Sequence, residues 1–294
     1  MATVSARSAW WLAIRPATLT ASAAPVLVGS GAAWADGAFA AGPALAALLG
    51  ASLLQVGANF ANDVFDFERG ADNAERLGPQ RATQQGWISP AQMKRAMWLA
   101  FAGAAAVGVY LTYTAGWPVL ALGLLSIAAA YLYTGGPRPY GYLGLGDLSV
   151  FLFFGPGAVA GTYFVQALSV STLAWYAAIP IGALATAILV VNNLRDIETD
   201  ARAGKNTLAV RLGDGATRTY YLVLLAIAYL VPLLIWWRGL GSAWVMLPWL
   251  SLPLGLKLAA HMRHDRGLAL NGSLVRTAHL EVVFGLLFAI GLAW

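Results

Sequence analysis

Two short acidic segments carry the side chains of this sequence that are best suited to chemistry. The first acidic segment is NFANDVFDFERGAD, residues 59–72, and the second acidic segment is NNLRDIETDARAGKNT, residues 192–207. Each follows a long apolar run, yet eight of the 13 acidic residues lie between positions 63 and 75 or between 196 and 200. Because acids at such density repel one another, the two segments predict a site that binds positive charge.

If both segments are helical, their oxygen-bearing side chains share one face of each helix, because positions i, i+3, i+4 and i+7 lie on the same side. The first set is Asn59, Asn62, Asp63 and Asp66; the second is Asn192, Asp196 and Asp200, flanked by Asn193. Carboxylate oxygens suit a hard cation such as Mg²⁺, which usually takes one or two carboxylates together with phosphate oxygens of a substrate. The spacing therefore favours a shared Mg²⁺ site.

Basic residues in the same segments and their loops could bind the phosphate groups of such a substrate through charge-assisted hydrogen bonds. They are Arg69, Arg76, Arg81, Arg195, Arg202 and Lys205. Acids, a divalent cation and bases beside apolar runs predict a diphosphate site for a substrate with a lipid tail. Glu68 points off the shared face and Glu75 lies in the following loop, so we expect both side chains to be solvated.

The rest of the chain has the composition of a membrane protein. It is 59% hydrophobic and 11% charged, with a mean hydropathy of +0.66, whereas soluble domains carry about 25% charged residues. Nine continuous apolar runs approach the ~20 residues that a helix needs to cross a bilayer. They lie at 17–35, 43–61, 96–115, 117–134, 147–167, 174–193, 219–237, 242–260 and 277–293. We expect a single all-α domain over residues 1–294, with nine transmembrane helices in one bundle around a central cavity.

The basic residues predict the orientation of this bundle. With a cytoplasmic N-terminus, 17 of the 18 Lys and Arg residues fall in cytoplasmic segments and Arg238 alone lies outside, an asymmetry that orients membrane proteins. Both acidic segments then lie near the cytoplasmic face, and the C-terminus lies outside. An outer belt of tryptophans is also expected: Trp34, Trp117, Trp175, Trp236, Trp237, Trp244 and Trp294.

Composition also excludes several classes of function. The net charge of +5 does not predict a nucleic-acid partner, because no basic patch with interleaved aromatic residues accompanies it. The absence of cysteine excludes disulfides, thiolate metal sites and a cysteine nucleophile. The glycines of GPGAVAG, residues 155–161, predict close helix packing inside a span. In GLGD, residues 144–147, Asp147 is expected to be the N-cap of the next helix.

The acidic segments, together with RLGPQRATQQGWIS and RPATL at 15–19, resemble the UbiA superfamily of intramembrane prenyltransferases over essentially the whole chain. The resemblance implies that Asn62, Asp63 and Asp66, then Asp196 and Asp200, hold Mg²⁺ and a prenyl diphosphate, and that Lys205 touches the diphosphate. It also brings the loop with Arg138, Tyr140 and Asp147 over the site. Many relatives carry an acid where this chain has Gly70, and Asp72 is the candidate substitute.

Within the superfamily, YTGGPRPYGYLGLGDLSVFLFFG at 133–155 and both acidic segments look most like the bacterial naphthoate polyprenyltransferases of menaquinone biosynthesis. That resemblance implies a multi-pass protein of the bacterial cytoplasmic (inner) membrane, in contact with its lipids. It would join a polyprenyl diphosphate to 1,4-dihydroxy-2-naphthoate with loss of CO₂ and diphosphate, giving demethylmenaquinol.

Two alternatives stay open from the sequence. One is prenylation of 4-hydroxybenzoate or another aromatic acceptor by the same kind of site. The other is an ion-coupled secondary transporter, since Asn62 and Asp66 recur as Asn192 and Asp196 after the same 130 residues, as in an internal repeat. Transporter sites usually lie near the bilayer midplane on broken helices. Acids at one face beside a cluster of bases favour phosphate chemistry instead.

Overall fold

The computed structural model describes residues 5–72 and 77–294. Its α-helices are α1 (Ala6–Ile14), α2 (Pro16–Ala35), α3 (Ala41–Glu68), α4 (Pro90–Ala115), α5 (Trp117–Leu132), α6 (Gly146–Leu152), α7 (Gly161–Ala167), α8 (Thr172–Arg195), α9 (Ile197–Arg202), α10 (Leu208–Trp237), α11 (Leu252–His264) and α12 (Leu270–Ala293). Short 3₁₀ segments are η1 (Tyr140–Leu143), η3 (Ala243–Ser251) and η4 (Gly267–Ala269), and η2 (Phe153–Ala160) is a π-helix. The described residues contain no strand, so the all-α prediction is confirmed.

The prediction of nine transmembrane helices is not confirmed. In the described part of the chain, seven helical stretches are long and apolar enough to span a membrane, or eight if the bent pair α1–α2 counts as one span. The remaining predicted run forms α5, which has 16 residues. At a rise of 1.5 Å per residue, 16 residues extend about 24 Å, less than the ~30 Å of the hydrocarbon core. Hydropathy located the run but overestimated the length of its helix.

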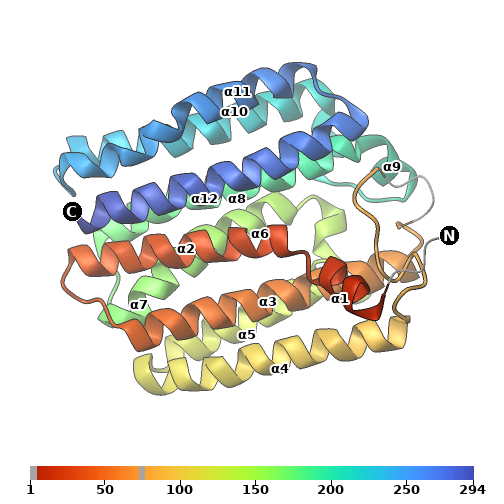
Figure 1. Cartoon of the computed structure of the whole chain (residues 1–294), viewed down its shortest axis with the longest axis horizontal. Helices are drawn as coiled ribbons and strands as arrows, with labels where there is room; N and C mark the ends of the chain where they lie inside the picture. The colour runs from red at the N-terminus through yellow and green to blue at the C-terminus, as the bar shows by residue number, and fades with distance from the viewer. Residues whose placement is uncertain (1–4, 73–76) are drawn as a thin grey trace.

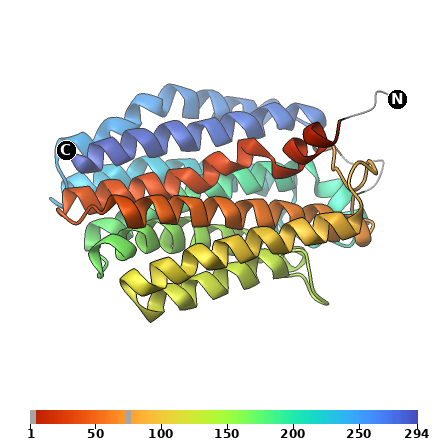
Figure 2. The same cartoon turned by 60° about the horizontal axis from the view of Figure 1, so that its bottom comes forward.

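The long helices run alongside one another between two ends of the bundle (Figures 1 and 2). The C-terminal end of α3, the segment around α9 and the α1–α2 bend lie at one end, and the C-terminus lies at the other (Figure 1). The seven tryptophans predicted for the outer belt are all at least half exposed. They occur at the helix ends that face away from the acidic segments, as an interfacial belt requires.

The core of the bundle is built around α8, which packs against α2, α10, α12 and η2. Most of its side chains are buried, and its apolar residues belong to the largest hydrophobic cluster of the protein. Close packing through small residues is confirmed at η2, where a Cβ on Gly155 would lie 2.8 Å from the Ala178 carbonyl oxygen of α8. This rigid centre carries the second acidic segment at its C-terminal end.

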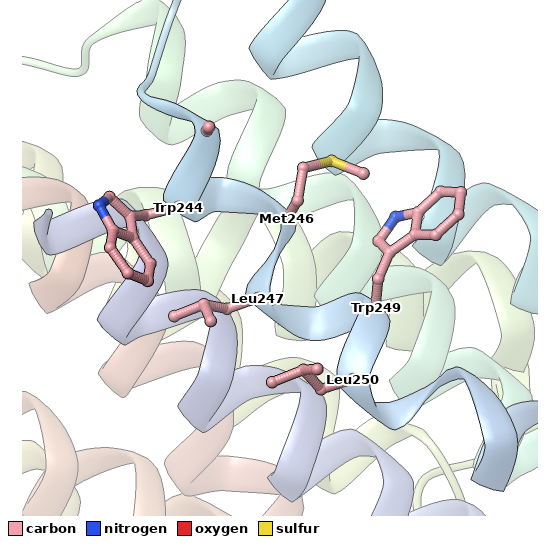
Figure 3. A pocket seen from close by; sticks show the side chains of 6 residues that line it. Trp244, Met246, Leu247, Trp249 and Leu250 are labelled. Carbon is pink, nitrogen blue, oxygen red and sulfur yellow. The ribbon is translucent and has the colours of Figure 1, made fainter.

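A shallow hollow on the surface of the bundle lies along η3 (Figure 3). Its lining consists of Ala243, Trp244, Met246, Leu247, Trp249 and Leu250. The hollow presents no acidic or basic side chain, and it begins at the tryptophan-rich end of the bundle. Its chemistry suits contact with lipid tails and not the recognition of a phosphate, so the candidate site lies elsewhere.

Candidate active site

The first acidic segment forms the last turns of α3, as its spacing predicted. Asn59, Asp63 and Asp66 are all buried, and they come from the helical face that the i, i+4, i+7 spacing defines. Glu68 instead forms an exposed ion pair with Lys94 at 2.7 Å, which agrees with the expected solvation of its side chain. Glu75 and Arg76 lie outside the described residues.

Asp66 is the centre of a buried charge cluster. Its Oδ1 accepts a hydrogen bond from the Tyr142 hydroxyl at 2.6 Å and lies 3.2 Å from the Lys205 Nζ. Its Oδ2 lies 3.6 Å from Nη2 of Arg81, whose Nε is 3.1 Å from Asp72 Oδ2. Two acids and two bases therefore balance one another in a region with little access to solvent.

Gly70 explains how Asp72 enters this cluster. Gly70 ends α3 with φ +72°, a left-handed conformation that glycine adopts without strain. The amides of Ala71 and Asp72 then both return to the carbonyl oxygen of Asp66, at 2.9 and 3.2 Å. An acid at position 70 would meet strain in this conformation. The turn instead places the carboxyl group two residues later, against Arg81.

Asp63 contacts the loop that follows the first acidic segment. Its two carboxylate oxygens accept hydrogen bonds from the backbone amides of Ala82 and Thr83, at 3.1 and 3.0 Å. These bonds fix the residues directly after Arg81 and so help to position its guanidinium beside Asp66. Nη1 of that guanidinium is buried and has no hydrogen-bond partner among the residues that the structure describes. Arg81 thus keeps a donor available for an anion.

The two asparagines of the first segment connect neighbouring elements. Asn59 Nδ2 donates to the Ile14 carbonyl and to Thr18 Oγ1, both at 2.8 Å, and so joins α3 to the α1–α2 bend. Asn62 Oδ1 accepts a hydrogen bond from the Thr134 hydroxyl at 3.0 Å. Both contacts hold the end of α3 in place against segments that are distant in sequence.

The second acidic segment contains a buried pair between neighbouring residues. Arg195 Nε donates to Asp196 Oδ1 at 2.8 Å, and its Nη2 to Asp196 Oδ2 at 2.5 Å. The same guanidinium donates to Asn192 Oδ1 at 2.9 Å and to Asn271 Oδ1 at 2.7 Å. All three of its nitrogens have protein partners, so the geometry makes Arg195 an organiser of Asp196.

The remaining predicted residues of this segment surround that pair. Asn193 is buried at the end of α8, and Asp200 lies on α9. The backbone amide of Lys205 donates to the carbonyl oxygen of Asp200 at 2.8 Å. This contact directs the chain so that the Lys205 side chain reaches Asp66, which brings the two acidic segments together.

The loop between α5 and α6 contacts residues of both acidic segments. Arg69 Nε donates to the Thr134 carbonyl at 3.1 Å, and its guanidinium also contacts the Gly136 carbonyl. Lys205 Nζ lies 4.7 Å from the centre of the Tyr142 ring, and the Arg69 guanidinium carbon lies 5.7 Å from it. Tyr142 therefore contacts residues from both segments, and its ring is bordered by two cations.

Tyr142 and Asn271 were missed by the sequence analysis. Burial and the adjacent Asp66 carboxylate raise the pKa of Tyr142, so its hydroxyl stays protonated and serves as a donor. Asn271 Nδ2 donates to the Leu77 carbonyl at 3.0 Å while its Oδ1 accepts from Arg195. Tyr142 lies in the 133–155 stretch that carries the resemblance but was not singled out there, and Asn271 lies in none of the quoted segments. The roles of both residues arise from contacts across 76 positions of sequence.

The three residues that the resemblance placed over the site, Arg138, Tyr140 and Asp147, occupy different environments. Arg138 is exposed. The Tyr140 hydroxyl contacts the Ala129 carbonyl and Ser149 Oγ, both at 2.9 Å, so it stabilises packing within this region. Asp147 is buried in the first turn of α6, whose N-cap is Leu145. The N-cap prediction for Asp147 is therefore wrong: the helix begins one residue before it.

The donor set of the site fits a divalent cation in kind, since it consists of carboxylate and amide oxygens. In residues 5–72 and 77–294, no three acidic or histidine side chains are grouped closely enough to hold an ion. Asp66 and Asp196 are occupied by cationic side chains instead. Because Lys205 and Arg81 are also groups that bind phosphate, a metal-bound diphosphate could exchange partners with these ion pairs.

Comparison with known proteins shows the family to which the sequence is similar. The sequence profile of the UbiA prenyltransferase family matches residues 22–292. The 1,4-dihydroxy-2-naphthoate octaprenyltransferase of Escherichia coli is 41% identical over 98% of this chain and 96% of its own. The protein of that name from Mycobacterium tuberculosis is 43% identical over 88% and 87%, respectively.

Solved structures share the fold. A UbiA homologue from Aeropyrum pernix superposes with a TM-score of 0.71 at 16% identity, over 92% of this chain and 96% of that one. A UbiA homologue from Archaeoglobus fulgidus bound to GPP and Mg²⁺ gives a TM-score of 0.62 at 15% identity, over 96% and 99%.

Proposed function

This chain belongs to the UbiA prenyltransferase family, and from that premise we propose that it transfers a polyprenyl group from an allylic polyprenyl diphosphate to 1,4-dihydroxy-2-naphthoate. The products are demethylmenaquinol, CO₂ and diphosphate, which makes the reaction a step of menaquinone biosynthesis. The observation that carries the proposal is the 41% identity to the E. coli octaprenyltransferase over 98% of this chain. The paired acids and bases at one end of the bundle support it independently.

Recognition of the diphosphate rests on the basic residues of the cluster. Arg81 has a buried Nη1 without a partner in the described chain, and Lys205 is held at the junction of both segments. Arg69 lies on the other side of the Tyr142 ring. Arg195 and the amides of Asn62, Asn192 and Asn193 complete the proposed binding set.

Mg²⁺ is the proposed cofactor, held by Asp63, Asp66, Asp196 and Asp200, with Asp72 and Asn59 as supporting residues. When bound, the ion would neutralise negative charge that the diphosphate gains as it leaves. The A. fulgidus homologue of the same fold binds GPP and Mg²⁺, which supports Mg²⁺ as the cofactor. Lys205, Arg81 and Arg195, which pair with Asp66 and Asp196 in this structure, would then hold the phosphate oxygens.

The transfer begins when the bond between the prenyl carbon and the diphosphate oxygen breaks, and the diphosphate leaves with the electron pair. Arg81 and Lys205 stabilise the departing charge, as preorganised cations do in water-poor sites. The apolar walls of the bundle keep water from the allylic cation. The ring carbon that bears the carboxylate attacks this cation, and loss of CO₂ restores the aromatic ring.

The protein acts within a lipid bilayer, where its polyprenyl substrate also resides. The apolar lengths of its helices support a multi-pass membrane protein. We place the N-terminus and the active site at the cytoplasmic face of the bacterial inner membrane and the C-terminus outside, following the distribution of Lys and Arg.

The fate of the acceptor carboxylate tests this function. With dihydroxynaphthoate labelled in its carboxyl group, purified protein should release labelled CO₂ and diphosphate in a one-to-one ratio. With 4-hydroxybenzoate, attack occurs beside the hydroxyl and the carboxylate would be retained. A naphthoate product that keeps the label, or a faster reaction with 4-hydroxybenzoate, would contradict the proposed acceptor.

A further inference from the structure

Asp147 is a buried acid that the steps above do not use. Its side chain lies in the first turn of α6 and is 5% exposed. Its Oδ2 is fully enclosed and has no hydrogen-bond partner within the described part of the chain. An acid in a first turn is stabilised by the helix dipole, but a buried polar atom without a hydrogen-bond partner destabilises the fold by more than that gain. Stability alone therefore does not account for Asp147.

The Tyr133 phenol connects Asp147 with the two acidic segments. A Cβ on Gly146 would lie 2.9 Å from the Tyr133 hydroxyl, so the phenol packs directly against the start of α6. Burial raises the pKa of Tyr133, and the negative charges of Asp147, Asp66 and Asp200 raise it further. Thr134, the residue after Tyr133, donates to Asn62 Oδ1 of the first acidic segment at 3.0 Å. The same stretch of chain therefore contacts the end of α3 and the start of α6, which places Asp147 at the border of the site.

Asp147 differs chemically from the acids of the charge cluster. Asp66, Asp72 and Asp196 each pair with Lys or Arg, and Asp63 binds two backbone amides. The oxygens of these acids are therefore already engaged by cationic side chains or backbone donors. Asp147 forms no ion pair with the Lys and Arg residues that the structure describes. An acid without a cationic partner is the one best suited to accept and return a proton.

We propose that Asp147 binds a hydroxyl of the aromatic acceptor and takes its proton as the prenyl group is transferred. The inference rests on the proposed function and deepens it. As the hydroxyl proton moves to Asp147, the oxygen becomes a ring carbonyl and the ring carbon forms its bond to the prenyl carbon. The bond to the carboxylate then breaks, CO₂ leaves, and its electron pair returns to the ring. The carbonyl oxygen takes the proton back from Asp147, so all atoms and charges balance.

Access to Asp147 requires a small movement. Because Oδ2 is enclosed, a neighbouring side chain must yield when the acceptor binds. Tyr133 directly follows the last residue of α5, and its phenol packs against the start of α6. It is the side chain that we expect to move. Its hydroxyl remains protonated and can donate a second hydrogen bond to the acceptor.

The test compares Asp147→Asn with Asp147→Glu, using Asp36→Asn as a matched control. Asp36 lies at the opposite end of the bundle, where its Oδ2 accepts a hydrogen bond from Tyr163. Calorimetry with Mg²⁺ and a non-reactive prenyl thiolodiphosphate reports whether each variant is folded and binds the first substrate. We expect that affinity to change less than threefold in all three variants.

Turnover should fall about 100-fold in Asp147→Asn, within the range of about 10²–10⁴ typical of general bases. Asp147→Glu should recover at least tenfold relative to Asp147→Asn, and Asp36→Asn should match the parent protein. Ring-fluorinated dihydroxynaphthoates have a more acidic hydroxyl, so a weaker base suffices for them. With these acceptors, the loss of turnover in Asp147→Asn relative to the parent protein should be smaller than with dihydroxynaphthoate.

The role of Asp147 would be overturned if Asp147→Asn lost turnover equally with dihydroxynaphthoate and with its ring-fluorinated forms. It would also be overturned if that variant lost less than threefold in turnover, or if it no longer bound the thiolodiphosphate. Failure of the parent protein to prenylate dihydroxynaphthoate would instead overturn the proposed function itself. The two failures are therefore distinct.

Discussion

Replacing Asp66 with asparagine tests the charge cluster most directly. The substitution keeps the size of the side chain and an oxygen that can accept the Tyr142 hydrogen bond, and removes only the negative charge. The cluster of Asp66, Asp72, Arg81 and Lys205 then changes from neutral to a net charge of +1. Lys205 keeps its position over the Tyr142 ring but loses its carboxylate partner at 3.2 Å.

The magnitude of the effect follows from burial. Removing one partner of a buried ion pair costs about 3–5 kcal/mol. We take this as an upper bound for the decrease in the free energy of unfolding, because the Lys205 side chain retains 13% exposure and can turn toward solvent. For catalysis, loss of one group that stabilises the leaving charge costs about 2.7–4 kcal/mol, or about 10²–10³ in turnover.

Diphosphate release by purified protein at saturating substrates measures this loss, and thermal unfolding in the same detergent reports stability. Glu68→Gln is the matched control, since Glu68 lies two residues later on α3 in an exposed pair with Lys94. That exposed pair contributes about 0–1 kcal/mol to stability and lies outside the charge cluster, so Glu68→Gln should leave turnover unchanged. If Asp66→Asn kept more than a third of parental turnover, the charge cluster would not be the diphosphate site.

Three further predictions concern the metal, the core and the orientation. Excess EDTA should abolish turnover and added Mg²⁺ should restore it; full activity in EDTA would exclude the proposed acids as metal ligands. Glu281→Leu should raise the midpoint of thermal unfolding, because both oxygens of this fully buried carboxyl lack partners in the described chain and such groups cost about 1–3 kcal/mol; a lower midpoint would reveal an unrecognised partner. A reporter fused after Trp294 should be active outside the cytoplasm, and activity only in the cytoplasm would contradict the predicted orientation.

The sequence predicted the helices that carry the acids better than it predicted where helices begin. The apolar runs end at positions 61 and 193. The helix α3 continues to Glu68, as the spacing of its acids required, but α8 ends at Arg195 and the chain leaves the helix at Asp196 before α9 begins. The prediction that Asn192, Asp196 and Asp200 share the face of one helix is therefore wrong. In contrast, α10 begins at Leu208, 11 residues before its predicted run at 219, and is broken by a kink at Gly213 (φ +76°), while α12 begins at Leu270. Hydropathy detects only the part of a helix within the bilayer. Polar ends of helices are stabilised by protein contacts that it does not register.

The site shows the same limit. The spacing of Asp63 and Asp66 correctly placed both on a buried face of α3, but it could not distinguish their surroundings. Asp63 binds backbone amides of a loop about 20 residues away, whereas Asp66 binds side chains from three other parts of the chain. These differences depend on how the loops fold back over the helix ends. A pattern within one helix holds no information about such long-range contacts.

Asn271 has a consequence for the order in which the protein is made. Its single amide contacts Leu77 in the first loop and Arg195 at the end of α8, and it lies at the start of α12, which leaves the ribosome after both acidic segments. Every acid of both segments is synthesised before this residue. The acids are therefore synthesised before the contact that fixes their loops exists, and this contact forms only once α12 has emerged. A chain that stops before α12 would contain all the proposed ligands and still lack an ordered site.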